Sequence, residues 1–310
     1  MLQHISSVKQ LSNKKLLDGL FERATHFQAV QPKNYPKPLE NKIIASLFFE
    51  PSTRTRFSFE TAVYRLGGNV ITVENGIVSS SAVKGETIED TIRTINGYAD
   101  GIIMRHPVNG AALVAARFSN VPFINAGEGS GEHPTQALLD LYTIQKTKGN
   151  LDGLKIALVG DLLYGRTVHS LIYLLSIYKV ELYLIAPPAL KVPAVYKNHL
   201  KQKGVKFHEA SSWKDIIGNV DVMYMTRVQK ERFDSPKQYN LYKDSFVFDN
   251  SSLKQLKNDA AILHPLPRVN EIASEVDNDP RALYFEQVKN GLYVRMALLE
   301  YVFGDNKSNA

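Results

Sequence analysis

The chain has 310 residues, of which 44% are hydrophobic and 22% charged, as is typical of folded globular proteins and not of disordered ones. This length predicts two domains, since one domain commonly has about 100 to 200 residues. The absence of cysteine excludes disulfides, thiolate zinc sites and a cysteine nucleophile. We expect a cytoplasmic protein with no membrane association, because no segment is apolar enough for a membrane helix and the N-terminal segment is too polar for a signal peptide.

The formal net charge of +6 suits an anionic partner, either nucleic acid or small anionic substrates. The densest basic cluster, "TRVQKER" at 226–232, is interrupted by Gln229. A nucleic-acid surface usually needs a longer basic stripe with stacking aromatic residues. We therefore favour small anions and expect no nucleic-acid partner. A non-catalytic protein that binds anions or nucleic acid is the alternative from another class.

Short apolar segments alternate with amphipathic helices along the whole chain, and each segment ends in a turn rich in Gly, Pro, Ser or Thr. This alternation predicts an α/β fold with two doubly wound, largely parallel sheets. Apolar stripes indicate a helix within 86–98 and another from Val168 to Tyr178. A polar, turn-rich segment at 146–153 marks the expected domain boundary. The expected strands are 42–49, 69–73, 101–105, 121–126, 154–160, 180–186, 220–226 and 260–265.

The first strand leads into a helix through "EPSTRTRFSFE" at 50–60. The hydroxyls of Ser52, Thr53 and Thr55 and the guanidinium of Arg54 add donors to a helix N-terminus, which attracts anions by itself. A plain N-cap is the alternative, and one of these hydroxyls is expected to cap the helix, but a cap uses one hydroxyl and no arginine. The stretch therefore predicts a phosphate site. Arg56 is expected to point elsewhere and to be structural.

Polar residues also end or follow other expected strands, at the edge where open α/β sheets bind ligands. They are Arg105, His133, Gln136, Arg227, Gln229 and the segment 264–267. A lone His before Pro134 is more often a cap or a core residue, but together with Gln136 it can polarise a carbonyl and hold an amide, as acyl transfer requires. The turn "PLP" at 265–267 exposes backbone carbonyls, and either X-Pro bond could be cis. Lys84 lies in a polar loop, and its spacing alone does not single it out.

Several compact motifs are missing from the chain: a G-x-G-x-x-G after a strand, a P-loop, H-E-x-x-H and the G-x-S-x-G elbow. We therefore expect no metal and no cofactor. A site built from arginines, one histidine, one glutamine and hydroxyls would position two anionic substrates and stabilise a tetrahedral oxyanion.

Over nearly its whole length the chain resembles the aspartate and ornithine carbamoyltransferase family, and within it the aspartate-specific catalytic chains. The motifs occur in the family's order and spacing: "FFEPSTRTRFSFE", "KGETIEDTI", "MRHP", "EHPTQALLDLYTI", "GDLLYGRTVHS", "YMTRVQKERF" and "HPLPR". The resemblance implies a carbamoyl phosphate domain at 1–149, an aspartate domain at 150–285 and a C-terminal helix at 286–305 that packs back on the first domain. It also implies an active site in the cleft between the domains and at the subunit interface.

The resemblance assigns a role to each matching position. The phosphate would be held by Ser52, Thr53, Arg54, Thr55 and Arg105. The carbamoyl oxygen would be held by Thr55, Arg105 and His133. Its amine would be held by Gln136 and the backbone carbonyls of Leu266 and Pro267. Aspartate would be bound by Lys84, Arg166, Arg227 and Gln229, since a planar guanidinium pairs bidentately with a carboxylate. Ser80 and Lys84 would come from a neighbouring subunit, and the catalytic set would be Arg54, Thr55, Lys84, Arg105 and His133.

The implied reaction transfers the carbamoyl group of carbamoyl phosphate to the amine of L-aspartate, an early step of pyrimidine biosynthesis, in a homotrimer. In some members separate regulatory chains join two trimers. Leu163 and Val83 depart from the family pattern, which commonly has Lys at the first position and often at the second. We expect the chemistry to survive these departures and any effect to fall on domain-closure contacts and on an allosteric response.

Ornithine carbamoyltransferase is the nearest alternative, because it shares the phosphate motif and "HPTQ". Its pattern has a cysteine where this chain has Leu266, and this chain has no cysteine. The second ammonium of ornithine would also be repelled by Arg166 and Arg227. The sequence therefore favours aspartate as the substrate.

Overall fold

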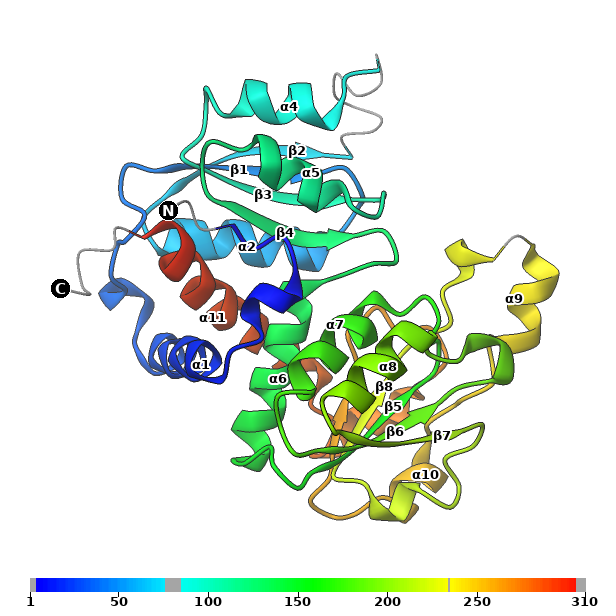
Figure 1. Ribbon diagram of the computed structural model, residues 1–310. Helices are drawn as coiled ribbons and strands as arrows, with labels where there is room; N and C mark the ends of the chain where they lie inside the picture. The colour runs from blue at the N-terminus through cyan, green and yellow to red at the C-terminus, as the bar shows by residue number, and fades with distance from the viewer. Residues whose placement is uncertain (1–3, 76–84, 234, 305–310) are drawn as a thin grey trace. The chain divides into compact units, whose positions relative to one another are not determined.

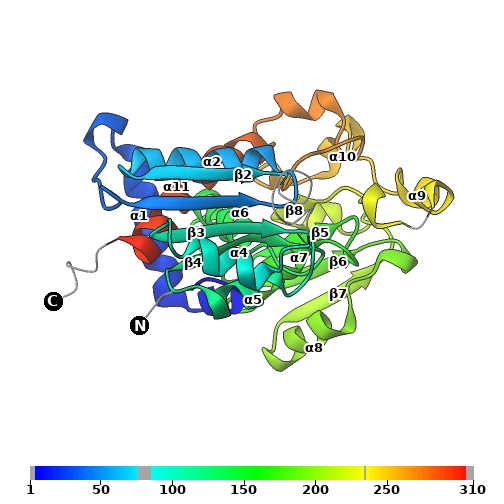
Figure 2. The same cartoon turned by 90° about the horizontal axis from the view of Figure 1, so that it is seen from above.

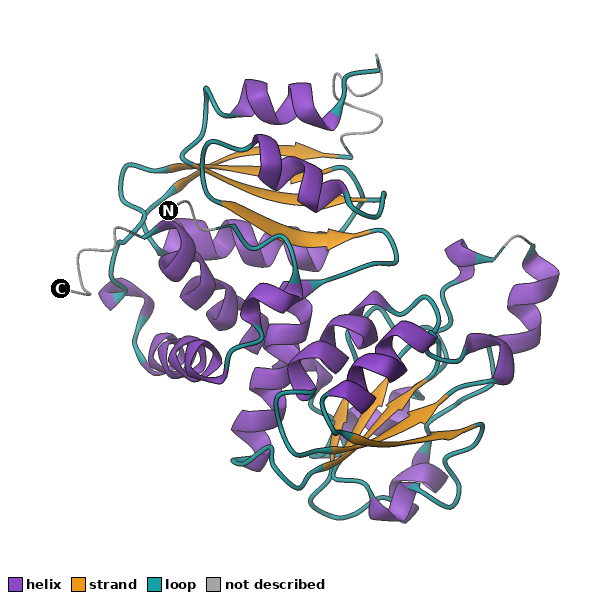
Figure 3. Cartoon of the chain, in the orientation of Figure 1, coloured by secondary structure: helices purple, strands orange, loops and turns teal. Residues whose placement is uncertain are grey.

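The computed structural model describes residues 4–75, 85–233 and 235–304. The chain divides into two units, Met1–Leu139 with Val288–Ala310, and Asp140–Gln287. Each unit contains one parallel sheet flanked by helices (Figure 3), which confirms the predicted α/β class with two parallel sheets. The divisions fall inside the helices α6 (Pro134–Lys148) and α11 (Tyr284–Phe303). In the described part of the chain, no helix combines the length and the apolar character needed to cross a membrane.

The sheet of the first unit has the strand order β2-β1-β3-β4 (Figure 2), with all neighbours parallel. Helices α4 and α5 cover one face, and α2 and α11 lie on the other (Figure 1). The strands are β1 (Ile43–Phe48), β2 (Asn69–Glu74), β3 (Gly101–His106) and β4 (Phe123–Glu128), and the helices are α1 (Lys14–Ala29), α2 (Thr53–Arg65), α4 (Ile88–Ile95) and α5 (Ala111–Phe118).

Burial explains why β1 reads as a continuous apolar run and not as an alternation. Ala45 and Leu47 pack in the cluster that contains Ile92 of α4 and Ala115 of α5. The intervening Ser46 lies toward α2 and donates to Glu60 Oε1 at 3.0 Å. A central strand of a parallel sheet is covered on both faces, so both sets of side chains are buried.

The sheet of the second unit has the strand order β7-β6-β5-β8-β9, again with all neighbours parallel. Helices α7 and α8 lie on one face and α10 on the other (Figure 1). The strands are β5 (Lys155–Val159), β6 (Glu181–Ile185), β7 (Lys206–Ala210), β8 (Val222–Met225) and β9 (Ala261–Leu263), and the helices are α7 (Arg166–Leu175), α8 (Ala194–Gln202), α9 (Pro236–Tyr242) and α10 (Asn250–Gln255).

Strand β7 was not predicted from the sequence. It reads "KFHEA" and has no buried residue, because it is an edge strand with one neighbour, β6. Polar side chains are common on edge strands, since they discourage pairing with another chain. The hydrophobic pattern that revealed the central strands is therefore absent here for a physical reason.

Both sheets reverse their strand order beside their first strand. In the first unit the chain runs from β1 to β2 on one side and then to β3 on the other, and in the second unit β6 and β8 flank β5 in the same way. Open α/β sheets bind ligands at such switch points, at the carboxyl ends of the strands. The loops that follow β1 and β3, and those that follow β5 and β8, are therefore the places where ligands are expected.

Candidate functional site

The loop after β1 leads directly into the N-terminus of α2. Ser52 is the N-cap residue, and its side chain makes no capping hydrogen bond, so the cap expected in this stretch is not supplied by its N-cap residue. Thr53 and Arg54 are exposed, whereas Thr55 is buried. The first backbone N–H groups of any α-helix have no acceptor within the helix. The end of α2 therefore combines backbone donors, hydroxyls and a guanidinium, as a phosphate site requires.

Arg56 differs from Arg54 in its surroundings. Its Nη1 lies 2.7 Å from Glu74 Oε2 at the end of β2, and its guanidinium stacks over the ring of Phe57 at 5.1 Å. These contacts fit the structural role expected for Arg56.

Arg105 and His133 come from different strand ends and meet over Gly127. Both are buried, and Arg105 Nε lies 3.3 Å from Glu50 Oε2. Gly127 has a φ of 118°, and a Cβ placed there would lie 3.2 Å from His133 Cδ2 and 3.4 Å from Arg105 Nη1. Such a φ strains any residue with a side chain. Glycine at 127 thus permits the close approach of the two side chains.

The N-terminus of α6 carries Gln136, which is buried and whose N–H donates to the His133 carbonyl at 3.1 Å. Arg295 of α11 supports this helix end from within the first unit. Its Nη2 lies 3.4 Å from Thr135 Oγ1, and its guanidinium lies 5.1 Å from the ring centre of Phe59 on α2. Arg295 was not predicted from the sequence, although a lone arginine in the apolar stretch "LYVRMALL" was the available signal.

In the second unit, Asp161 organises the loop between β5 and α7. Its buried carboxylate accepts the N–H groups of Leu163 and Tyr164 at Oδ1, at 3.1 and 2.9 Å. Gln229, which follows β8, donates through Nε2 to the Tyr164 carbonyl at 2.9 Å. Burial raises the pKa of Asp161, although backbone hydrogen bonds and the charge of Arg227 oppose the shift. Sequence reasoning missed Asp161, since one Asp after a strand is a common turn residue.

The two arginines expected to bind aspartate lie on neighbouring strand ends. Arg166 begins α7, which follows β5, and Arg227 follows β8. These strand ends approach closely at Gly160, where φ is 120° and a Cβ would lie only 2.2 Å from the Thr226 carbonyl oxygen. The structure therefore brings Arg166, Arg227 and Gln229 to the switch point of the second sheet.

Strand β9, beside β8, ends at the turn 264–267. Its Leu266–Pro267 bond is cis, which answers the question that the sequence left open. His264 is buried, whereas Leu266 and Pro267 are more accessible.

The predicted residues Ser80 and Lys84, and the departure at Val83, lie outside the described residues. Within the described ranges, no group of three or more His, Cys, Asp or Glu residues could hold a metal ion.

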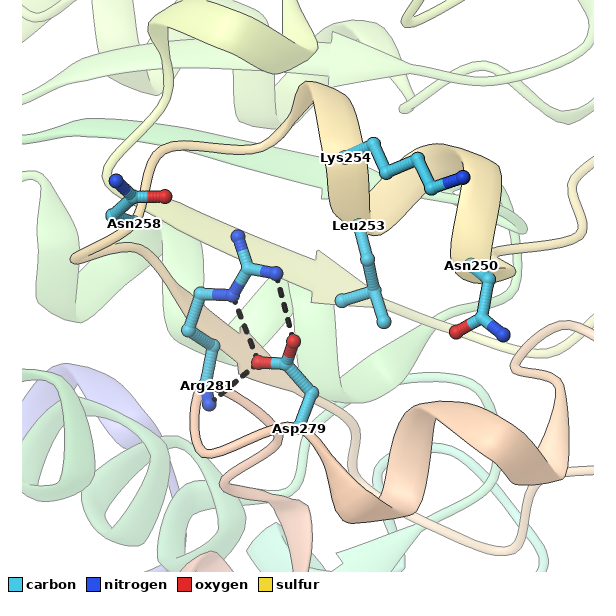
Figure 4. Close-up of a pocket in the computed structure, with 6 residues that line it drawn as sticks. All are labelled: Asn250, Leu253, Lys254, Asn258, Asp279 and Arg281. Carbon is cyan, nitrogen blue, oxygen red and sulfur yellow. Dashed lines mark hydrogen bonds and ion pairs between the residues drawn. The ribbon is translucent and has the colours of Figure 1, made fainter.

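A hollow of about 390 Å³ in the second unit contains none of the predicted residues (Figure 4). The Asp279 carboxylate in it is held by Arg281, whose Nε and Nη2 each donate at 2.8 Å. Arg281 also donates through Nη1 to the carbonyls of Leu256 and Lys257, at 3.1 Å each. These groups bind one another and tie the loop ends together, so we interpret the hollow as structural. It is lined by Asn250, Leu253, Lys254, Asn258, Asp279 and Arg281.

Two parallel α/β units with arginine, histidine and amide side chains at their switch points define a protein that binds small anionic substrates. Comparison with known proteins agrees with this class of protein. Residues 3–146 match the family model for the aspartate/ornithine carbamoyltransferase carbamoyl-P binding domain, and residues 152–302 match that for its Asp/Orn binding domain. The chain belongs to the aspartate/ornithine carbamoyltransferase family.

Individual relatives cover almost the whole chain. The aspartate carbamoyltransferase catalytic subunit of Methanocaldococcus jannaschii is 49% identical over 307 residues, 99% of each chain. That of Clostridium acetobutylicum is 52% identical over 290 residues, 93% of this chain and 94% of its own. A solved structure of the M. jannaschii subunit matches with a TM-score of 0.89, 48% identity and coverage of 99% and 100%. Trypanosoma cruzi aspartate transcarbamoylase in complex with carbamoyl phosphate and aspartate matches with a TM-score of 0.90 and 40% identity, over 96% of this chain and 95% of its own.

Proposed function

We propose that this chain transfers the carbamoyl group of carbamoyl phosphate to the amine of L-aspartate, giving N-carbamoyl-L-aspartate and phosphate. The observation that carries the proposal is the full-length similarity, at about half identity, to proteins named aspartate carbamoyltransferase catalytic subunit. The product places the reaction in pyrimidine biosynthesis.

The first unit supplies the groups for carbamoyl phosphate. Ser52, Thr53, Arg54 and Thr55 bind the phosphate at the N-terminus of α2, and Arg105 bridges the phosphate and the carbonyl oxygen. The neutral amine of aspartate attacks the carbamoyl carbon and forms a tetrahedral intermediate. Thr55, Arg105 and His133 stabilise its oxyanion, as preorganised donors do in acyl transfer. The bond to the phosphate oxygen then breaks, phosphate leaves, and the attacking nitrogen loses a proton.

The second unit supplies the groups for aspartate. Arg166 and Arg227 each offer a planar fork for one carboxylate, and Gln229 is held beside them through Tyr164. The carbonyls of Leu266 and Pro267, with Gln136 of the first unit, accept the N–H groups of the carbamoyl amine. Two guanidinium groups favour a dicarboxylate over ornithine, whose second ammonium they repel.

The test incubates the purified protein with carbamoyl phosphate and either L-aspartate or L-ornithine and measures the carbamoylated product. We expect turnover with aspartate and, with ornithine, a rate at least about a hundredfold lower, because of charge repulsion within the site. Turnover with ornithine alone, or with neither amine, would reject the proposal.

We further propose a cytoplasmic homotrimer in which Ser80 and Lys84 of one subunit complete the site of the next. In such a trimer, Lys84→Ala and Arg54→Ala damage different contributors to each site. Mixing the two inactive proteins under subunit exchange should restore measurable activity, because some sites then receive an intact Arg54 and an intact Lys84. Proven exchange without recovery would mean that each subunit holds a complete site.

A further inference from the structure

The turn after β9 holds Leu266 in an unusual backbone conformation. Its φ is 51°, in the left-handed region, which costs a residue with a side chain about 1 to 2 kcal/mol. A leucine keeps this conformation only where neighbouring groups hold it in place.

His264 and Glu271 hold both ends of this turn. The imidazole is 1% exposed, accepts the Leu266 N–H at Nδ1 at 2.8 Å, and lies 2.7 Å from Glu271 Oε1 through Nε2. The other oxygen of Glu271 accepts the N–H groups of Val269 and Asn270, at 3.1 and 3.2 Å. Because Nδ1 accepts a hydrogen bond, the ring proton lies on Nε2 and is donated to Glu271. Two side chains thus fix three backbone N–H groups of the turn.

The charge states of the pair agree with this arrangement. Burial lowers the pKa of His264 and outweighs the opposing effect of Glu271, and the charges of Arg268 and Arg227 lower it further. Burial raises the pKa of Glu271, but the hydrogen bonds from His264 and from the backbone leave it below its ordinary value. The pair is therefore a neutral imidazole and a carboxylate, and the imidazole nitrogen remains free to accept the Leu266 N–H.

The backbone of His264 is anchored separately in the buried interior of the second unit. Its N–H donates to Gln287 Oε1 at 3.0 Å, and Gln287 Nε2 donates to Asp140 at 2.5 Å. The hydroxyl of Tyr224 on β8 donates to the same carboxylate at 2.7 Å. The imidazole that holds Leu266 is thus fixed to the sheet and not only to its own turn.

We propose that His264 and Glu271 are positioning residues that aim the Leu266 carbonyl at the carbamoyl amine, an inference that rests on the proposed function. The direction of this carbonyl follows from the backbone dihedrals of Leu266, which the bond to Nδ1 fixes. Carbonyl oxygens recognise an NH2 group but offer nothing to a methyl group. Acetyl phosphate, which has CH3 where carbamoyl phosphate has NH2, therefore reports on how well the carbonyls are placed.

The experiment measures kcat/KM for carbamoyl phosphate and for acetyl phosphate, at saturating L-aspartate, in the wild type, His264→Gln and His264→Asn. Glutamine reaches Glu271 but has no acceptor at the Nδ1 position, whereas asparagine carries one there. The preference for carbamoyl phosphate is the ratio of kcat/KM for carbamoyl phosphate to kcat/KM for acetyl phosphate. We expect His264→Gln to lower this preference about tenfold, the scale of one hydrogen bond. We expect His264→Asn to lower the preference by less than about threefold, because its amide oxygen still accepts the Leu266 N–H.

His208→Gln is the matched control. His208 also contacts a glutamate, Glu181 at 2.8 Å, in the same unit, but it lies on the edge strand β7 and is exposed. Its substitution should leave the preference unchanged. Inhibition by inorganic phosphate should also stay within about twofold of the wild type in all variants, because the carbonyls contact only the carbamoyl end.

The outcomes separate the two proposals. A wild type without turnover on carbamoyl phosphate and aspartate would reject the proposed function and this inference with it. If the wild type is active and folded His264→Gln keeps the wild-type preference, the positioning role alone is rejected. The same holds if His264→Gln slows the reactions of both substrates equally. If His264→Gln does not fold, Glu271→Gln takes its place, since it keeps the side-chain volume but turns a donor toward the N–H groups of Val269 and Asn270. A preference equal to that of the wild type in a folded Glu271→Gln would also overturn the inference.

Discussion

The two units build their ligand sites in different ways. In the first, the proposed phosphate donors are four consecutive residues at the N-terminus of α2, where the helix also offers its backbone N–H groups. In the second, Arg166, Gln229 and Leu266 follow three different strands, and buried side chains such as Asp161 and His264 hold the loops around them. A site of the first kind is a property of a short stretch of sequence. A site of the second kind depends on buried side chains that hold several separate loops, so it is more easily disturbed by substitutions that never touch a ligand.

The largest effect is expected in the local site. Arg54→Ala should lower turnover at least about a hundredfold, the scale of losing one preorganised contact to transition-state charge. Arg56→Ala is the control two residues away, because Arg56 is paired with Glu74, and it should lower turnover by less than about threefold. Steady-state kinetics of both variants checks this. Equal losses of turnover in the two variants would show that the start of α2 acts as one structural unit. The proposed difference between the sites of the two units would then be wrong.

An intermediate effect is expected from the buried carboxylate of the second unit. Asp161→Asn keeps the size of the side chain but replaces one acceptor oxygen with an NH2 group that faces backbone donors. The loop between β5 and α7 should then loosen, and KM for aspartate should rise about tenfold, as one buried hydrogen bond is lost. Inhibition by inorganic phosphate should stay within about twofold of the wild type, because the proposed phosphate residues lie in the first unit.

Asp221→Asn provides the matched control for this substitution. Asp221 precedes β8 at the amino end of the strands and accepts the Lys155 N–H at 2.8 Å. The same chemical change at the opposite end of the strands should leave KM for aspartate unaltered. If Asp161→Asn weakens phosphate inhibition as much as it weakens aspartate binding, the two sites are not built independently.

The smallest effect is expected in the pH dependence of stability. The pKa of His264 is lowered from its ordinary value of 6.5 in the folded chain, so the unfolded chain takes up the proton first as the pH falls. Stability is therefore lost as the pH decreases from about 6.5 to the folded-state pKa, by up to about 1.4 kcal/mol per pH unit. His264→Asn should reduce the slope of the unfolding free energy between about pH 7 and 5 in urea titrations.

The wild type supplies the comparison for this measurement. Both proteins are titrated with urea at the same series of pH values, so that the two slopes are compared directly. An unchanged slope in His264→Asn would mean that folding does not lower the pKa of the buried imidazole.

Much of the fold could be read from the sequence. The central strands are buried on both faces, so each appears as a short apolar run followed by a turn, and the structure confirms the two parallel sheets. The edge strand β7 was not predicted, because none of its residues is buried and its sequence therefore has no apolar run. The sequence could not reveal Asp161 or Glu271 as supports either, because a carboxylate that accepts backbone N–H groups has no distinctive spacing along the chain.

By itself the sequence determined the strand ends, the donor-rich start of α2 and the family of the chain, because these follow from residue types and their order over short stretches. Only the tertiary structure decided that Arg105 and His133 meet over Gly127 and that His264 and Glu271 hold Leu266 in a left-handed conformation. The first is a contact between strand ends that only folding brings together, and the second is local in the chain but depends on the burial of His264. Their geometry depends on how the strands are ordered within each sheet, which no local pattern records.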